Sequence, residues 1–330
     1  MSLYTRRGFG GVLLAAVPAL PFLRSASAAA KVNSKINGVR MGLQSACFTF
    51  SGMGIERIIS TMVSVGLGEI DVMAEHVENY LGAPGVQLPG AGRPGPWARP
   101  VTAGQAEGAP AARRGGAGAG FGRGQDPAAR EALRKWRLDV SLDRYKAVAK
   151  MFTDAGLTFY SYNLSFNDTH TDEEIEKGLE MARALGTRII TASSPLTVLP
   201  RVGPLAEKHN VVVALHNHTI GPDDFAQAMA ISKNIWVNLD VGHFFASGHD
   251  PLAYLKEHHA RITNVHVKDR QKNQGREMPF GQGDTPLKEV LLFIRREKYN
   301  FPVCIEYVGP DGPAIELKRC FDYCKAVLSS

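Results

Sequence analysis

Val211-Val-Val-Ala-Leu-His216-Asn-His218-Thr219 is an uninterrupted apolar run that ends at two histidines. Three of its five apolar residues are β-branched, and neither glycine nor proline breaks the run. A run of this length and composition is typical of a strand that is buried on both faces, as in a parallel sheet. The polar residues at its end predict that the strand leads into a functional site.

Three later segments repeat this pattern. Each is an apolar run of strand length that ends at a side chain able to bind a metal ion. They are residues 235–240, which end at Asp240, residues 262–266, which end at His266, and residues 302–306, which end at Glu306. We therefore expect four successive strands to carry metal-capable side chains at their carboxyl ends.

Strand-like and helix-like segments alternate along the whole chain. The expected strands are 39–45, 66–73 (closed by Glu75 and His76), 157–163, 187–192, 211–216, 235–240, 262–266 and 302–306. The expected helices are 55–65, 141–155 (with Ser141 as N-cap), 171–185, 199–209, 222–232, 251–259, 286–297 and 313–328. Crossovers of helix length require parallel strands, and eight repeats predict a (β/α)8 TIM barrel, a single domain over residues 31–330. An open doubly wound sheet is the alternative, but no Gly-rich phosphate turn follows the first strand.

The first thirty residues carry the features of an export signal. A twin-arginine pair in Thr5-Arg6-Arg7-Gly8-Phe9 precedes an apolar segment, 12–23, and the cleavage pattern Ala26-Ser27-Ala28. This leader resembles those of the Tat pathway, which exports folded proteins. A membrane anchor is the alternative, but the apolar segment is short for a span and holds two prolines. We therefore predict cleavage, no stable membrane insertion afterwards, and a periplasmic or extracellular mature protein.

A segment rich in glycine, arginine and proline, residues 81–130, interrupts the alternation after the second strand. Its composition buries too little apolar surface to offset the entropy of ordering it, so we predict a mobile insert on the active face. The RGG-like tract 113–124 is typical of RNA-binding segments, but an export leader argues against that role. The large aromatic residues of the insert, Trp97 and Phe121, suggest a loop that folds over a ligand, which is a hypothesis only.

The net charge of +6 comes from the leader and the insert. The leader has three arginines and no acids, and residues 82–130 have six arginines against two acids, which leaves the rest near −1. No basic stripe interleaved with aromatic residues is present, so the sequence argues against nucleic-acid binding.

Four cysteines in an exported protein raise the question of disulfides: Cys47, Cys304, Cys320 and Cys324. Cys320 and Cys324 lie four residues apart on one expected helix, which is a poor geometry for a bridge. Cys47 falls just past the first expected strand and Cys304 lies within the last, and these two strands would be neighbours in a closed barrel. We predict buried free thiols.

The four strand ends predict a metal site. Active sites of (β/α)8 barrels lie at the carboxyl ends of the strands, so His216, Asp240, His266 and Glu306 should converge. Two imidazoles and two carboxylates suit Mn²⁺, Zn²⁺, Co²⁺ or Fe²⁺, whereas Ca²⁺ and Mg²⁺ prefer oxygen ligands alone. Any one of these residues could be a hydrogen-bonded core residue, and Asp240 could be a helix N-cap. The prediction rests on all four occupying equivalent places in a repeating architecture.

His218, His243 and Lys268 follow the same strands and complete the candidate site. Either histidine could orient a ligand, bind substrate or transfer protons. Lys268 lies on the same face as His266 and could polarise a carbonyl or hydroxyl oxygen, although a solvated loop charge is the simpler alternative. Five other histidines lie in or beside expected helices and are assigned no role: His170, His209, His249, His258 and His259.

The motifs Asn238-Leu-Asp240-Val-Gly-His243, His266-Val-Lys-Asp269, Gly281-Gln-Gly283 and Ile305-Glu306 resemble those of the sugar phosphate isomerase/epimerase family. These are the xylose isomerase-like TIM barrels, which include ketose 3-epimerases and endonuclease IV, and the resemblance covers residues 39–328 without the insert. It implies one divalent ion held by Glu, Asp, His and Glu, positions that fall on His216, Asp240, His266 and Glu306. The chain departs from the family at His216. In the 3-epimerases the two glutamates also move protons on opposite faces of the substrate carbon, and here Glu306 alone remains.

The resemblance implies an enzyme that deprotonates the carbon next to a carbonyl of a sugar or keto-sugar. Reprotonation would make it an isomerase or epimerase, with Glu306, His218, His243 and Lys268 as candidate catalytic residues. Expulsion of a β-leaving group would make it a 3-keto-glycoside lyase or hydratase, the main alternative. A non-catalytic exported sugar-binding protein is an alternative of another class. A nuclease would need more acids and a basic face. The expected partner is a small carbohydrate, and a homo-oligomer stays open.

Overall fold

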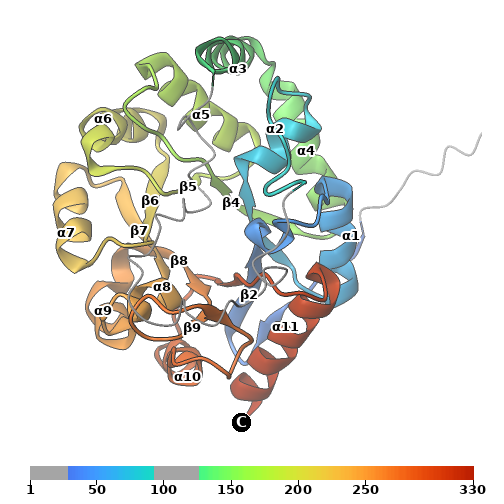
Figure 1. The fold of residues 1–330 in the computed structure, drawn as a ribbon, viewed down its shortest axis with the longest axis vertical. Coiled ribbons are helices and arrows are strands. Elements are labelled where there is room, and N and C mark those ends of the chain that lie inside the picture. The colour runs from blue at the N-terminus through green and yellow to red at the C-terminus, as the bar shows by residue number, and fades with distance from the viewer. Residues whose placement is uncertain (1–28, 93–125) are drawn as a thin grey trace, which may run out of the picture.

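A closed barrel of parallel strands forms the centre of the molecule, with helices around it (Figure 1), in a computed structural model that describes residues 29–92 and 126–330. The strand order is β2-β11-β8-β7-β6-β5-β4-β3, and β3 pairs back to β2 to close the barrel. The strands are β2 (Val39–Gln44), β3 (Glu69–Met73), β4 (Thr158–Asn163), β5 (Ile189–Ala192), β6 (Val212–His216), β7 (Ile235–Asp240), β8 (Ile262–Val267) and β11 (Val303–Ile305). The predicted (β/α)8 fold is confirmed, and the two ends of the barrel sequence lie side by side through the β2–β11 pairing.

All eight predicted helices are present, with ends shifted by one residue at most. They are α1 (Ile55–Val65), α4 (Leu142–Asp154), α5 (Asp172–Ala184), α6 (Leu199–His209), α7 (Pro222–Ile231), α9 (Pro251–His258), α10 (Leu287–Glu297) and α11 (Pro313–Ser329). Ser141 caps α4 by accepting the backbone N–H of Asp143, as predicted. Thr171 and Glu174 form a capping box at α5. Local sequence signals therefore set most helix ends.

Several elements, most of them short, were not predicted. They are β1 (Lys35–Ile36), the 3₁₀ helix η1 (Ser45–Phe48), α2 (Ala74–Tyr80), α3 (Pro127–Asp139), η4 (Leu196–Val198), α8 (Val241–Ala246), η5 (His259–Arg261) and the hairpin of β9 (Asp269–Arg270) with β10 (Glu277–Met278). The second strand begins at Glu69 and not at residue 66, because Gly66 has a φ of 86° and ends helix α1. Glu75 and His76 lie on α2 and do not close the strand.

Helix α3 corrects the predicted extent of the insert. It begins at Pro127, where Asp126 accepts the backbone N–H of Ala128, so the last residues of the predicted mobile segment are helical. At the other flank Leu81 and Ala83 are buried. Residues 93–125, including Trp97 and Phe121, lie outside the described residues.

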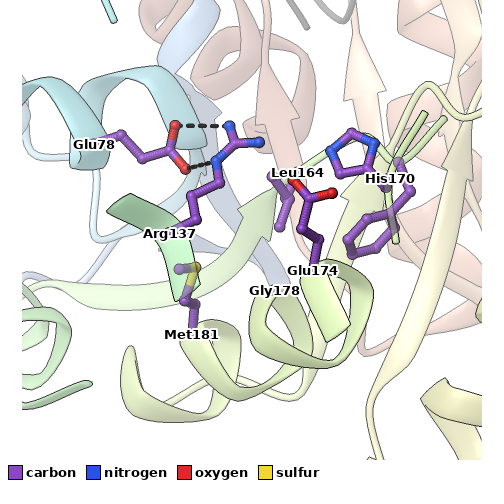
Figure 2. A pocket seen from close by; sticks show the side chains of 8 residues that line it. Glu78, Arg137, Leu164, His170, Glu174, Gly178 and Met181 are labelled. Atoms are coloured by element: carbon purple, nitrogen blue, oxygen red, sulfur yellow. Dashed lines mark hydrogen bonds and ion pairs between the residues drawn. The ribbon is translucent and has the colours of Figure 1, made fainter. Parts of the chain in front are cut away.

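Two ion pairs attach α3 to the barrel. Arg137 donates both Nε and Nη2 to the carboxylate of Glu78 on α2, at 2.7 and 2.9 Å, and both side chains are buried. Figure 2 shows this guanidinium facing the carboxylate beside a small cavity that Leu164, His170 and Met181 line. Arg130 pairs with Glu174 on α5 at 2.7 Å. These contacts join α2, α3 and α5, which lie together in Figure 1.

The four cysteines are free and buried, as predicted. The Cys47 thiol lies 3.3 Å from the carbonyl oxygen of Ile305 and accepts the backbone N–H of Tyr307 at 3.4 Å. The thiol of Cys47 therefore connects the turn that follows β2 to the end of β11, without a disulfide.

Within residues 29–92 and 126–330, no helix has both the length and the apolar character that a membrane crossing requires. The twin-arginine motif and the cleavage pattern of the predicted leader lie outside the described part of the chain.

Candidate metal centre

The structure brings His216, Asp240, His266 and Glu306 together at the carboxyl ends of β6, β7, β8 and β11. All four side chains are buried, and one ligand atom from each lies within 4.8 Å of the others. Strand register produces this arrangement, because Asp240 lies directly beside His266 in the β7–β8 pair. Glu306 follows the last residue of β11, where its backbone N–H still donates to Val267.

His216 presents a free lone pair to the centre. Its Nδ1 lies 2.8 Å from Oδ1 of Asn238, and the Asn238 amide donates to the carbonyl oxygen of Asn264. That second contact orients the Asn238 amide, so Nδ1 of His216 is the protonated nitrogen and Nε2 carries the lone pair. Burial lowers the pKa of His216 well below its usual value. The ring is therefore neutral, which is the form that binds a metal ion.

His266 lies between two carboxylates. Its Nδ1 is 3.0 Å from Oε2 of Glu306, and its Nε2 is 3.0 Å from Oδ2 of Asp71. Burial alone would lower the pKa of His266, but these two hydrogen bonds raise it to about 9. The ring is thus an imidazolium in this arrangement, and a metal ion would compete with its proton.

Asp71 is a site residue that the sequence analysis missed. It is fully buried on β3 and accepts hydrogen bonds from Thr191 Oγ1 at 2.9 Å and from Gln44 Nε2 at 3.3 Å, besides its contact with His266. An acid inside an apolar strand was the available signal, whereas Glu75 and His76 were expected only to close this strand. His76 hydrogen-bonds Ser45 at 3.2 Å and belongs to the packing of α2.

Lys268 is a buried cation of the centre and not a solvated loop charge. Its Nζ donates to Oε1 of Glu306 at 2.7 Å and lies 3.8 Å from Oδ2 of Asp240. Burial alone would lower the pKa of Lys268, but Glu306, Glu277 and Asp240 raise it. Burial would likewise raise the pKa of Glu306, but Lys268 and His266 lower it well below its usual value. Lys268 and Glu306 are therefore an ion pair.

His218 and His243 lie beside His216. The ring of His218 is 4.7 Å from that of His216 and 4.8 Å from that of His243, centroid to centroid. The Nε2 of His218 hydrogen-bonds Ser193 Oγ at 3.1 Å. Burial, followed by the charge of Lys268, lowers the pKa of His218 to about 4. This imidazole is neutral at physiological pH.

His243 faces two cationic donors. Nη1 of Arg270 lies 2.7 Å from its Nδ1, and Nζ of Lys268 lies 3.2 Å from its Nε2. A neutral imidazole accepts at one nitrogen only, and neither cation can accept a hydrogen bond. One of the two contacts is therefore unfavourable. His216, His218 and His243 also form a possible ligand group, but the two cations make His243 a poor metal ligand.

Asp240 supplies the test of whether these residues fit a metal ion. Its Oδ1 accepts the backbone N–H of His243 at 2.7 Å, so Asp240 is also the N-cap of α8. Its Oδ2 is buried and has no hydrogen-bond partner among the described residues. Burial raises the pKa of this carboxyl to about 7. A buried carboxylate oxygen without a hydrogen bond, beside a neutral imidazole, suits a divalent ion with mixed nitrogen and oxygen ligands.

A closed parallel barrel with four metal-capable side chains on its last four strands defines a TIM barrel with a candidate metal centre. The chain belongs to the xylose isomerase-like TIM barrel family, whose model matches residues 111–324.

Curated relatives of the chain are a dehydratase and an epimerase. It is 26% identical over 131 residues to the inosose dehydratase of Clostridium tetani. The aligned region covers 33% of this chain and 44% of that protein. It is 28% identical over 102 residues to the L-ribulose-5-phosphate 3-epimerase UlaE of Salmonella paratyphi C. The aligned region covers 30% of this chain and 36% of that protein. The chain thus spans less than half the length of these relatives.

A similar solved structure is that of the IOLI protein with a binding zinc atom. The TM-score is 0.55 at 16% identity, over 88% of this chain and 98% of that one. At this identity the likeness shows a shared fold.

Proposed function

We propose that this protein is a divalent-metal-dependent enzyme that removes a proton from the carbon next to a carbonyl of a sugar or keto-sugar. The observation that carries the proposal is Oδ2 of Asp240, which accepts no hydrogen bond from the described residues and is buried among three other metal-capable side chains. The epimerase and dehydratase relatives support a sugar-modifying role. The zinc atom in the IOLI structure supports a transition-metal ion over Ca²⁺ or Mg²⁺.

His216, Asp240, His266 and Glu306 would hold the ion. When bound, it supplies Lewis-acid polarisation of the substrate carbonyl, which acidifies the neighbouring C–H. Lys268 would supply a further positive charge near the centre, which stabilises the negative charge that develops on the substrate.

His218 is the best-placed proton carrier. Both oxygens of Glu306 are engaged, one with Lys268 and one with His266, and both nitrogens of His243 face cations. His218 is neutral, so it is in the form that accepts a proton, and Ser193 orients it. Proton transfer by a positioned side chain contributes roughly 10²- to 10⁴-fold in rate.

The inosose dehydratase relative favours a second candidate, elimination from a 3-keto-glycoside. One base next to the carbonyl serves both reactions, and they differ in the fate of the carbanion. Reprotonation gives an epimer or isomer, whereas expulsion of the β-substituent gives an alkene and a free aglycone.

One experiment tests the enzyme and separates its two forms. Metal-loaded protein is incubated in D2O with free ketoses and with 3-keto-glucosides, and the products are followed by NMR. We expect deuterium at the carbon next to the carbonyl, and either an epimer or released aglycone identifies the reaction. His218→Gln should slow exchange by about 10²-fold or more while metal content stays unchanged. Metal-loaded protein that exchanges no substrate would contradict the proposal and leave a sugar-binding protein.

We also propose that residues 1–30 direct export by the Tat route, and that the enzyme meets its carbohydrate outside the cytoplasm. The twin-arginine pair and the Ala26-Ser27-Ala28 pattern support this. Mass spectrometry of the protein from a periplasmic fraction should give a mature N-terminus close to Ala29. An intact N-terminus in the cytoplasm would contradict it.

A further inference from the structure

The ammonium of Lys268 neutralises carboxylates that belong to the candidate metal centre. Its ammonium contacts Glu306 at 2.7 Å and lies 3.8 Å from Asp240, and both carboxylates belong to the four candidate ligands. A divalent ion bound by the same two carboxylates would be repelled by this ammonium in a buried site, where charges are screened poorly. Lys268 and the ion therefore compete for the same two carboxylates.

The contact of Lys268 with His243 is unfavourable as well. Its Nζ lies 3.2 Å from Nε2 of His243, whose Nδ1 already faces Arg270. The Arg270 guanidinium is fixed by the carbonyl oxygens of Gln274 and Gly275. Lysine is the more flexible of the two cations, so Lys268 is the one that can move.

A second carboxylate lies within reach of Lys268. Glu277, on strand β10, has its Oε2 3.9 Å from Nζ of Lys268, beyond hydrogen-bond distance. Its Oε1 accepts the backbone N–H of Val308 at 3.0 Å, so this side chain is held in place. Its side chain is 30% exposed, against 9% for Glu306, so Glu277 lies closer to solvent than the ligands do.

We propose that Lys268 is an internal substitute for the metal ion: it pairs with Glu306 while the site is empty and moves to Glu277 when a divalent ion binds. Glu277 is then a positioning residue, which acts on metal affinity through Lys268. The inference rests on the proposed metal centre and adds to it the group that controls loading.

Zinc affinity of charge variants tests this inference. Protein freed of metal by a chelator is titrated with Zn²⁺ in competition with a chromophoric chelator at fixed pH. Lys268→Met removes the competitor and should bind Zn²⁺ about tenfold more tightly, and Glu277→Gln removes the second carboxylate and should bind about tenfold more weakly. Glu277→Asp keeps the carboxylate and should return affinity towards that of the unchanged protein.

The double variant separates an indirect effect from a direct one. If Glu277 acts only through Lys268, Glu277→Gln should change affinity less than about twofold in the Lys268→Met background. Lys272→Met removes an exposed charge near the same hairpin and should leave affinity unchanged. Thermal unfolding of each variant shows whether it is folded. If Lys268→Met does not fold, Glu277→Gln and Glu277→Asp still test the inference, because Glu277 is only partly buried.

Two results would overturn the inference while the metal centre stands. One is a Lys268→Met protein that binds Zn²⁺ no more tightly than the unchanged chain. The other is a Glu277→Gln effect of equal size in both backgrounds, because Glu277 would then act directly on the ion. If neither the unchanged protein nor Lys268→Met binds Zn²⁺, the metal centre itself is wrong and this inference falls with it.

Discussion

Asp71 fixes the orientation of His266 from the opposite side of the barrel. Its Oδ2 accepts from Nε2 of His266, while Thr191 and Gln44 hold the carboxylate. Carboxylates of this kind orient a ligating histidine and raise its basicity. At the scale of single residues, Asp71 is therefore a contact outside the candidate ligands that orients one of them.

Asp71→Asn should lower zinc affinity by about 10- to 100-fold, because the amide can present its N–H to the ring and then no longer accepts the ring proton. Competitive zinc titration measures the effect. Asp168→Asn, at an exposed acid, is the matched control and should leave affinity unchanged. Equal affinities in the two variants would show that Asp71 does not act on His266.

Glu75 should make stability depend on pH. Burial raises the pKa of this half-buried carboxyl from 4.5 to about 8, and its Oε2 has no hydrogen-bond partner among the described residues. A carboxyl whose pKa is higher in the folded state stabilises the fold below the unfolded value of about 4.5, and that stability is lost as the pH rises towards 8.

Glu75→Gln imitates the protonated carboxyl and removes this loss. At pH 9 it should raise the unfolding midpoint by about 2–4 °C, as expected for about 1 kcal/mol in a domain of this size, and at pH 4 the midpoint should not rise. Calorimetric scans at the two pH values check it, with the exposed Glu56→Gln as control. A gain at pH 4 equal to that at pH 9 would contradict the linkage.

At the scale of elements, α3 contacts the barrel through both apolar and charged side chains. Its buried residues are Leu133 and Arg137, and Arg137 pairs with the buried Glu78 (Figure 2). The sequence analysis assigned this stretch to the Gly/Arg-rich segment that it directly follows, although Ala129, Leu133 and Trp136 are spaced as one apolar face. Trp136 packs against the core, and the ion pairs of Arg130 and Arg137 add to that contact.

Arg137→Met should lower the free energy of unfolding by about 3–5 kcal/mol, because it leaves the carboxylate of Glu78 buried without a counter-ion. Arg134, one turn earlier, pairs with the exposed Glu131 on the same helix. Arg134→Met should therefore change stability by less than about 1 kcal/mol. Chemical denaturation measures the free energy of unfolding of both variants. Equal losses would show that the buried ion pair stabilises the protein no more than the exposed one.

The loops after β7 and β8 also contain elements that the sequence pattern did not predict. The short helix α8 follows from the N-cap at Asp240, and the β9–β10 hairpin delivers Arg270 and Glu277 to the site. The hairpin strands have two residues each, too short for a periodic signal in the sequence. Arg270 and Glu277 were therefore missed, whereas Lys268, two residues after a predicted strand end, was found.

At the scale of the whole molecule, barrel closure explains which site residues the sequence could predict. His216, Asp240, His266 and Glu306 end successive strands of one repeating unit, so local pattern and fold together place them. Asp71 reaches His266 across the interior from a strand 195 residues earlier in the chain. No local pattern contains such a contact, because it exists only once the barrel has closed.

The central claim is that these four strand ends bind one divalent ion. Crystals of the protein grown with Zn²⁺ and measured on both sides of the zinc absorption edge test it most directly. We predict one anomalous peak per chain, from a zinc ion bound by His216, Asp240, His266 and Glu306. A fully zinc-loaded crystal with no peak at these four residues, or with its peak elsewhere, would contradict the claim.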